Sequence, residues 1–414
     1  MNYVAKYGIW AVRFWYAAWM IPAGIEHFYH IYPQPGANSP HPLAAQMLTA
    51  MLNSNLFDLV KGVELIAGLA VLFGFFSPLG LLIGMPVAFC VFWWDAPLSE
   101  WSTGSLIAGS RVLVGHLLIC VAYIACFRPM LVARAKLSAT GLLSNRQLVL
   151  AGRIVFGAWM LLNGLNHFFF SFWPTPMGGN PVSIELMTAL NDSWLLDVCM
   201  LIELVAGALI LLGLFVPLAL CVTMAVSTSA LYWAMVDHQP LTLALGLLAF
   251  ALNGLLMLAY LDSYRGALQR ESLTIGETQP HSSWNTLFVR PGGRTARREF
   301  MWALLPLAWG VWWYASKGPN VDVAPWGVLV LLYPAVILHV RRLHDLGLTG
   351  WFVALPAVLT VMAMLIWANR LSFGASLDAA VPVAALIVFI GFALWGALAK
   401  GRAEANRFGP PVEA

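Results

Sequence analysis

Long apolar segments, separated by short polar ones, run along nearly the whole chain. Each segment is bounded by turn residues or charges. They cover approximately residues 8–30, 57–76, 79–95, 106–127, 151–172, 195–215, 217–236, 240–261, 300–316, 325–340, 350–368 and 379–398. Because a helix rises ~1.5 Å per residue, about 20 apolar residues span the hydrocarbon core of a bilayer. The pattern therefore predicts an all-α integral membrane protein with about twelve transmembrane helices.

The composition agrees with a membrane protein. Of the 414 residues, 60% are hydrophobic and 10% are charged, whereas soluble domains carry about 25% charged residues. The net charge is only +3 and the basic residues form no single patch, so we expect no nucleic-acid partner. All five cysteines lie in apolar segments without a C-x-x-C motif, which argues against a cysteine-based metal site.

One apolar segment occurs twice. Residues 58–78 (DLVKGVELIAGLAVLFGFFSP) and 197–217 (DVCMLIELVAGALILLGLFVP) are identical at nine of twenty-one positions, at a constant offset of 139. The preceding segments also align, with WMIPAGIEHF matching WMLLNGLNHF, and each is followed by a predicted short interfacial helix, near residues 48–51 and 187–190. The repeat predicts two four-helix units in the same orientation.

A third set of four apolar segments does not match the repeat. We therefore predict a first unit over residues 1–135, a second over 145–264, a polar cytoplasmic linker over 265–293 and a last four-helix domain over 294–414. The cations between segments fall almost entirely on one side, with only Lys317 and Arg370 on the other. The positive-inside rule then places both termini in the cytoplasm.

Acidic residues lie inside the repeated segment. Glu64 and Glu203 occupy the same position in the two copies, and a carboxylate inside a bilayer costs about 3 kcal/mol. We predict that Glu64 with His27 and Glu203 with His167 form acid–base pairs in the outer half of the membrane. The alternative is that they are buried hydrogen bonds that only fix helix packing. Supporting ionisable groups in the same half are Asp58, Asp197, Glu26, Lys61 and Arg111.

The two copies differ in charge. Glu26 aligns with Asn166 and Lys61 aligns with Met200, so one acid and one base disappear together. This predicts an ion pair between Glu26 and Lys61 across two helices of the first unit. Lys61 also stands three residues from Glu64, close enough to pair within its own helix. Each unit offers too few converging ligands for a metal, so no metal site is expected.

The last domain carries basic motifs on its predicted cytoplasmic face. They read GRTARREF over residues 293–300, RRLHDLG over 341–347 and NRFGP over 406–410. Anchoring at the lipid headgroups accounts for these charges, and the functional alternative is contact with anionic lipid or a partner protein. The residues concerned are Arg294, Arg297, Arg298, Arg341, Arg342, His344 and Asp345.

Two families share these motifs. The pattern E-x-x-x-G-x-x-x-x-x-G, present at Glu64 and at Glu203, makes residues 8–262 resemble the DoxX-like family, with one unit per repeat. The basic motifs make residues 284–411 resemble the bacterial inner-membrane family called domain of unknown function 805. That second resemblance implies a four-helix membrane domain and no known activity.

The DoxX-like resemblance implies a function. It suggests a membrane subunit of a quinone-linked redox system in the bacterial inner membrane, with quinone as its cofactor and a membrane or periplasmic redox protein as its partner. Other members of that family act as helpers in trafficking or assembly. The alternative expectation is therefore a non-enzymatic scaffold, an assembly factor or a small-solute carrier.

Overall fold

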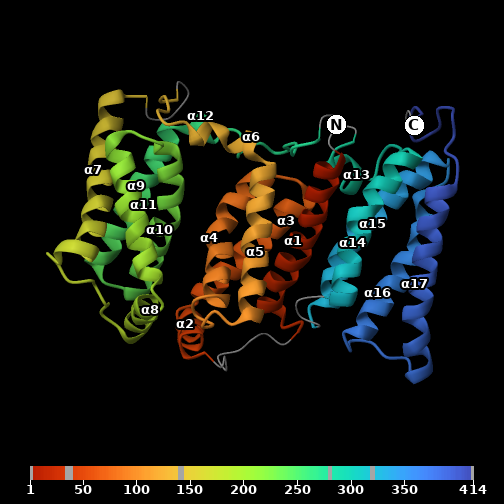
Figure 1. The fold of residues 1–414 in the computed structure, drawn as a ribbon, viewed down its shortest axis with the longest axis horizontal. Coiled ribbons are helices and arrows are strands. Elements are labelled where there is room, and N and C mark those ends of the chain that lie inside the picture. Colours follow the sequence, from red (N-terminus) through yellow and green to blue (C-terminus); the bar gives the residue numbers. More distant parts are fainter. Residues whose placement is uncertain (1–2, 33–40, 139–143, 278–281, 318–321, 412–414) are drawn as a thin grey trace.

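The computed structural model describes residues 3–32, 41–138, 144–277, 282–317 and 322–411. Within these ranges the chain is helical and forms no β-strand. Figure 1 shows the long helices standing side by side in three groups, which we call the first, second and third bundles. The protein is thus an all-α polytopic membrane protein, as the apolar pattern predicts.

Each bundle contains four long helices. The first consists of α1 (Tyr3–Tyr29), α3 (Leu56–Phe73), α4 (Ser77–Asp95) and α5 (Thr103–Ala122). The second consists of α7 (Arg146–Leu165), α9 (Leu195–Leu212), α10 (Val216–Asp237) and α11 (Pro240–Ala259). The third consists of α14 (Arg297–Lys317), α15 (Ala324–Asp345), α16 (Ala354–Trp367) and α17 (Ala375–Leu398). Of the helices in the described ranges, nine are long and apolar enough to cross a membrane, so the total of about twelve stays a prediction.

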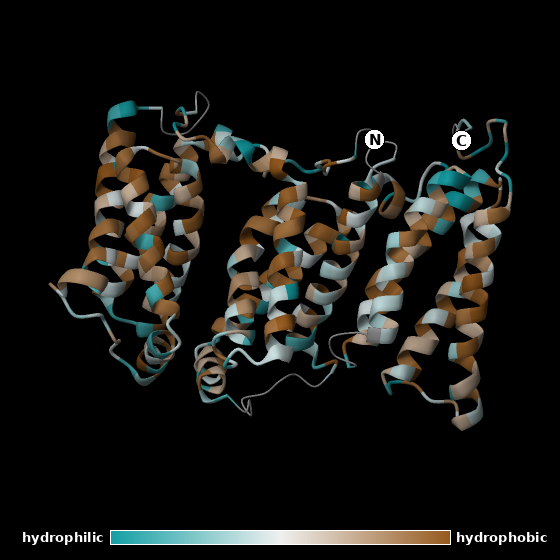
Figure 2. Cartoon of the chain, viewed as in Figure 1, coloured by the Kyte–Doolittle hydropathy of each residue, from teal (hydrophilic) through white to brown (hydrophobic). Residues whose placement is uncertain are grey.

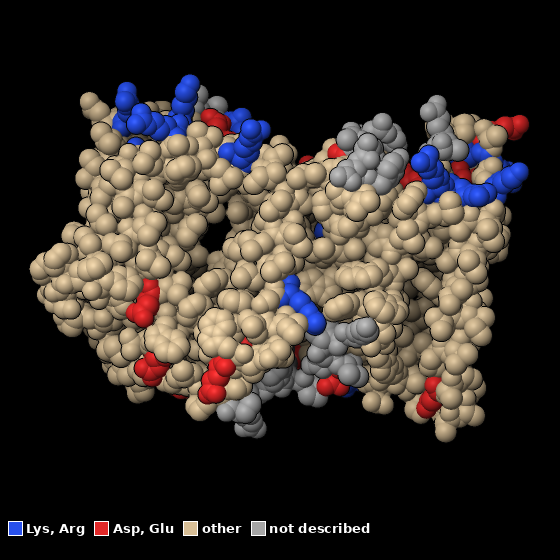
Figure 3. Space-filling model, viewed as in Figure 1, with Lys and Arg blue, Asp and Glu red and all other residues tan. Residues whose placement is uncertain are grey.

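Charge divides the two ends of the molecule. Apolar residues cover the middle of the bundles and hydrophilic ones gather at the ends (Figure 2). Lys and Arg concentrate at the end where both termini lie, and most of the visible Asp and Glu lie toward the other end (Figure 3). We call these the basic end and the acidic end. The short helices α2 (Pro42–Asn53) and α8 (Pro181–Asp192) lie at the acidic end, where the two interfacial helices were predicted.

The two copies of the repeat fold alike. The 18-residue helices α3 and α9 both end at a glycine with a left-handed backbone, Gly74 (φ 68°) and Gly213 (φ 71°). In the first bundle Arg13 donates to the Val71 carbonyl at 2.7 Å. Its counterpart Arg153 donates at 2.8 Å to the carbonyl of Ile210, which aligns with Val71. An arginine, buried in the first bundle and partly exposed in the second, thus closes the end of the acid-bearing helix, satisfying a carbonyl that the helix itself leaves free.

Glycines let the first two helices of each repeat pack closely. A Cβ on Gly207 would lie 2.5 Å from the Leu161 backbone nitrogen on α7, and a Cβ on Gly68 would lie 2.8 Å from Ile21 on α1. Contacts this short exclude any larger residue unless the helices move apart. Such small-residue contacts drive helix association in membranes, and here they set the acid-bearing helix against the histidine-bearing one.

The segment between the second and third bundles is partly buried. Its helix α13 (Trp284–Phe288) packs into the basic end of the first bundle, and Trp284 is 1% exposed. The Trp284 indole donates to the Leu72 carbonyl at 2.8 Å, and the guanidinium of Arg13 lies 4.0 Å from its ring. The sequence predicted a polar linker over residues 265–293. Part of this linker instead packs against the first bundle and closes its basic end.

Polar contacts join the bundles to one another. At the acidic end, Gln46 on α2 donates to Asp192 on α8 at 2.9 Å, and Tyr232 on α10 donates to the Ser54 carbonyl at 2.7 Å. The third bundle contacts the first through the Tyr314 hydroxyl, which donates to a backbone carbonyl of α1 at 3.1 Å. The three bundles therefore pack as neighbours in one row.

Candidate functional site

A histidine–aspartate pair lies near the acidic end of each repeat. His27, in the last turn of α1, contacts Asp58 in the first turn of α3, with Nε2 and Oδ1 separated by 2.5 Å. His167, in the short π-helix after α7, contacts Asp197 of α9 in the same way at 2.6 Å. Each aspartate also sits at a helix N-terminus, where the helix dipole favours negative charge. The repeat therefore conserves this pair between its two copies.

This geometry corrects the predicted Glu–His pairs. His27 binds Asp58 instead of Glu64, and His167 binds Asp197 instead of Glu203. The reason is depth along the helix, because each glutamate follows its aspartate by six residues, or ~9 Å of helix rise. A histidine at the end of the neighbouring antiparallel helix is level with the aspartate.

Glu64 pairs within its own helix. Its carboxylate lies 2.8 Å from Lys61 Nζ, and both side chains are buried. The predicted ion pair between Glu26 and Lys61 is therefore wrong, whereas the alternative pairing at three-residue spacing is confirmed. Glu26 is also buried, and one of its carboxylate oxygens lies 3.9 Å from His30 Nδ1. The cation of the first bundle thus neutralises Glu64, the acid of its repeated segment.

Glu203 has a different environment. It is 5% exposed, and its Oε2 atom has no hydrogen-bond partner within the described part of the chain. Met200 stands where the first bundle has Lys61, so the helix offers no cation. The neighbouring polar side chain is Asn163 on α7. The second bundle therefore contains a buried carboxyl group with one free oxygen.

Asn163 was missed from the sequence. It lies four residues before His167, one helical turn deeper on the same face of α7. Glu203 lies six residues deeper than Asp197, so counting turns from the two ends of the helices could have placed Asn163 near Glu203. An isolated Asn in an apolar segment gives a weak signal on its own.

Asn166 and the predicted residue Arg111 both lie apart from this site. Asn166, the counterpart of Glu26, exchanges two hydrogen bonds with the Trp173 backbone at 2.9 and 3.0 Å and so holds the loop after α7. Arg111 on α5 is exposed, and its guanidinium lies 5.4 Å from the Trp313 ring of α14. Arg111 therefore contacts the third bundle and does not join the acids of its own bundle.

In the third bundle most of the predicted lipid-contact residues are buried. Asp345 accepts hydrogen bonds from Arg294 at 3.0 Å and from Arg342. The arginines also donate to backbone carbonyls of Gly396 in α17 at 2.7 Å and of Glu404 in the C-terminal tail at 2.8 Å. This network fastens the tail to the basic end of α15.

Two other residues of the basic motifs, Arg341 and His344, also contact the chain itself. Arg341 donates to the Thr295 hydroxyl at 3.1 Å, and His344 stacks on Phe408 with 3.8 Å between ring centroids. The prediction of lipid or partner contact is therefore wrong for Arg294, Arg341, Arg342 and Asp345, which are buried and whose polar groups bind the chain itself. His344 is partly exposed, so for this residue the contact stays a prediction. Arg297 and Arg298 are exposed at the basic end, so headgroup contact stays a prediction for these two.

No group of three or more His, Cys, Asp or Glu in the described ranges could hold a metal ion. The arrangement can instead hold and pass protons, through a buried carboxyl group, an amide and a histidine–aspartate pair.

Comparison with known proteins adds two family matches. The DoxX family model matches residues 148–235, which cover most of the second bundle. The model described as a protein of unknown function, DUF805, matches residues 288–410. No curated protein and no solved structure matched the chain. The chain therefore carries a DoxX segment followed by a DUF805 segment, in the order that its motifs predicted.

Proposed function

We propose that this protein is a membrane subunit of a quinone-linked redox system, with its acid–base site at Glu203 in the second bundle. The observation that carries the proposal is the free Oε2 atom of this buried carboxyl group. Intramembrane carboxylates are costly and usually functional, and the DoxX match covers the bundle that contains this one.

The comparison between the repeats supports the second bundle as the active one. Lys61 neutralises Glu64 at 2.8 Å in the first bundle. The charge of Glu203 has no such partner, because Met200 takes the place of the lysine. A carboxyl group without a buried cation can gain and lose a proton at lower cost than one held in an ion pair. The first bundle, which repeats the same geometry, then serves mainly as a structural support.

The His167–Asp197 pair provides the next proton carrier. It lies toward the acidic end, and the aspartate side chain is 46% exposed, so the pair is in contact with solvent. A proton released at Glu203 would pass along α9 to this pair and then to water. Asn163 would orient the glutamate, because its amide can donate to one carboxylate oxygen while the other stays free.

Two features of the chain around Glu203 support quinone as the bound molecule. The helix α9 carries no charged residue besides Asp197 and Glu203, which suits a lipid-soluble ring, and the free oxygen of Glu203 would offer one hydrogen-bonding position. When bound, the quinone would supply the two-electron chemistry, with a membrane or periplasmic redox protein exchanging the electrons. The chain's own contribution is to bind the ring and to move the accompanying protons.

The charge asymmetry supports an orientation. Because Lys and Arg concentrate at the basic end, the positive-inside rule puts this end and both termini in the cytoplasm. The site at Glu203 and the His167–Asp197 pair would then face the periplasmic half of a bacterial inner membrane. We include this localisation in the proposal.

The test is to purify the full chain in mild detergent and to quantify co-purified quinone by mass spectrometry. We expect stoichiometric quinone with the wild type and loss of it in Glu203→Gln, which keeps the side-chain size but removes the acid. The control is Glu185→Gln on α8, a partly exposed acid outside the proposed site whose carboxylate accepts hydrogen bonds from Asn53. Quinone retained in Glu203→Gln, or absent from the wild type, would refute the proposal and favour a scaffold, assembly factor or solute carrier.

A further inference from the structure

Arg111 is an exposed cation on α5, a membrane-spanning helix. Most of the belt between the two ends of the molecule is free of acidic and basic side chains on the visible face (Figure 3), because a charge within the bilayer is costly. Intramembrane cations usually face the interior of a bundle and pair with a carboxylate. Arg111 does neither, since its guanidinium forms no ion pair and no hydrogen bond with any residue in the described ranges. A molecule from the membrane can therefore supply the balancing charge.

The guanidinium of Arg111 lies near the level of the lipid headgroups at the acidic end. Arg111 follows Thr103, where α5 begins at that end, by eight residues, so its Cα is ~12 Å along the helix. Its guanidinium lies 5.4 Å from the ring of Trp313, which is four residues, or ~6 Å, from the end of α14. The side chain thus extends toward the acidic end, as long basic side chains do in a bilayer. A headgroup of that leaflet is within its reach.

Exposed apolar side chains continue from this contact toward the middle of the membrane. On α5 they include Val114 and Leu118, three and seven residues after Arg111 and so on the same face of the helix. On α14 the exposed Trp309 lies one turn from Trp313, and the two rings are 5.7 Å apart. A cation near headgroup level with apolar surface beneath it matches the two parts of a phospholipid, its headgroup and its acyl chains.

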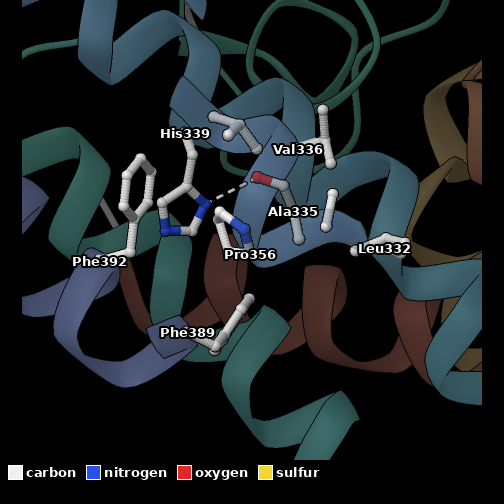
Figure 4. A pocket seen from close by; sticks show the side chains of 9 residues that line it. Leu332, Ala335, Val336, His339, Pro356, Phe389 and Phe392 are labelled. Carbon is white, nitrogen blue, oxygen red and sulfur yellow. Dashed lines mark hydrogen bonds between the residues drawn. The ribbon is translucent and has the colours of Figure 1, made fainter. Parts of the chain in front are cut away.

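The hollow in the third bundle is no alternative site for such a molecule. It is lined by His339 and apolar side chains, and Figure 4 shows the imidazole between Phe392 and Pro356. The space beside it has room for no more than about one water molecule. A molecule of lipid size must therefore bind on the outer surface of the bundles, where Arg111 lies.

We propose that an anionic phospholipid binds where α5 meets α14, with its phosphodiester on Arg111 and an acyl chain along Val114 and Leu118. The planar guanidinium has five N–H donors and can hold two phosphate oxygens at once. The Trp313 ring lies within the range of a cation–π contact and keeps the guanidinium in place. A zwitterionic headgroup would bring its own cation close to Arg111, so a net negative lipid is preferred. This site is separate from Glu203 and does not depend on the proposed function.

The test is photo-crosslinking of the full chain in nanodiscs made mainly of phosphatidylcholine. Two probes carry a diazirine midway along the same acyl chain, one on phosphatidylglycerol and one on phosphatidylcholine, and mass spectrometry of peptides maps the labelled residues. We expect the phosphatidylglycerol probe to label Val114, Leu118 and Trp309 about fivefold more than the other probe, the preference that one cation near the membrane surface gives. The exposed face of α11, a helix without charged residues, should be labelled equally by both probes and serves as the internal reference.

Two variants complete the test. Arg111→Gln should lower the ratio at α5 to that at α11, whereas Arg265→Gln, which removes an exposed cation paired with Asp262 at the basic end, should leave it unchanged. Equal labelling of α5 by the two probes in the wild type would overturn the proposal without any variant, as would an unchanged ratio in Arg111→Gln. Displacement of the phosphatidylglycerol probe by inorganic phosphate would also overturn it, because a free anion would then fill the site. So would the absence of labelling by either probe, which would mean that another protein or a second copy covers this surface.

Discussion

The buried charge network of the third bundle gives the sharpest prediction about stability. Asp345, Arg294 and Arg342 are 4%, 5% and 1% exposed, so one carboxylate balances two guanidinium groups away from water. Asp345→Asn keeps the shape but removes the only charge that balances both arginines in this network. Breaking a buried ion pair by removing one partner costs about 3–5 kcal/mol.

The consequence should appear in the C-terminal tail. Arg294 and Arg342 hold the tail through the carbonyls of Glu404 and Ala399. A loss of about 3 kcal/mol raises the population of the released tail by about a hundredfold, since 1.4 kcal/mol is about a factor of ten. Limited trypsin digestion of the full chain in detergent, followed through a C-terminal epitope tag, would measure this as faster cleavage after Arg402.

Two comparisons make this test decisive. Glu404→Gln changes an exposed side chain whose residue joins the network through its backbone, and it should leave the cleavage rate unchanged. Replacing Asp345, Arg294 and Arg342 together by Met removes all three charges and should recover part of the lost stability. If Asp345→Asn is cleaved at the wild-type rate and unfolds at the wild-type temperature, the network does not hold the tail.

Two further predictions concern the repeats. Gly207→Ala should lower the stability of the second bundle by about 1–3 kcal/mol, because its Cβ would lie 2.5 Å from the Leu161 nitrogen. Gly254→Ala, whose nearest neighbour is 3.9 Å away, should be neutral in the same thermal unfolding assay in detergent. Lys61→Met should destabilise the first bundle by about 3–5 kcal/mol, because it leaves Glu64 buried without its cation. The double variant with Glu64→Gln should recover most of that loss, and the pairing is wrong if the single and double variants unfold at the same temperature.

The apolar pattern was enough to predict the fold class. A helix that crosses a bilayer needs about 20 apolar residues and must satisfy all its backbone hydrogen bonds internally. The positions of such helices can therefore be predicted from the apolar segments alone. The repeat also predicted a shared local geometry, because its identical residues have structural roles. Gly74 and Gly213 end their helices with positive φ, and Gly68 and Gly207 allow close helix contact.

The partners of the ionisable groups were decided by the tertiary structure. Which acid a histidine contacts depends on the relative depth and rotation of the two helices. The partner of His167 is Asp197, which lies six residues before the predicted partner Glu203 on the same helix. Asp345 was predicted to lie at the surface as part of a basic motif. In the structure it is buried with Arg294 and Arg342, which also bind the C-terminal tail. The sequence by itself shows which segments enter the membrane and which ionisable side chains they carry, because the free energy of transferring a segment into the bilayer depends on its composition. Their pairing follows from packing, which brings together residues far apart in the chain.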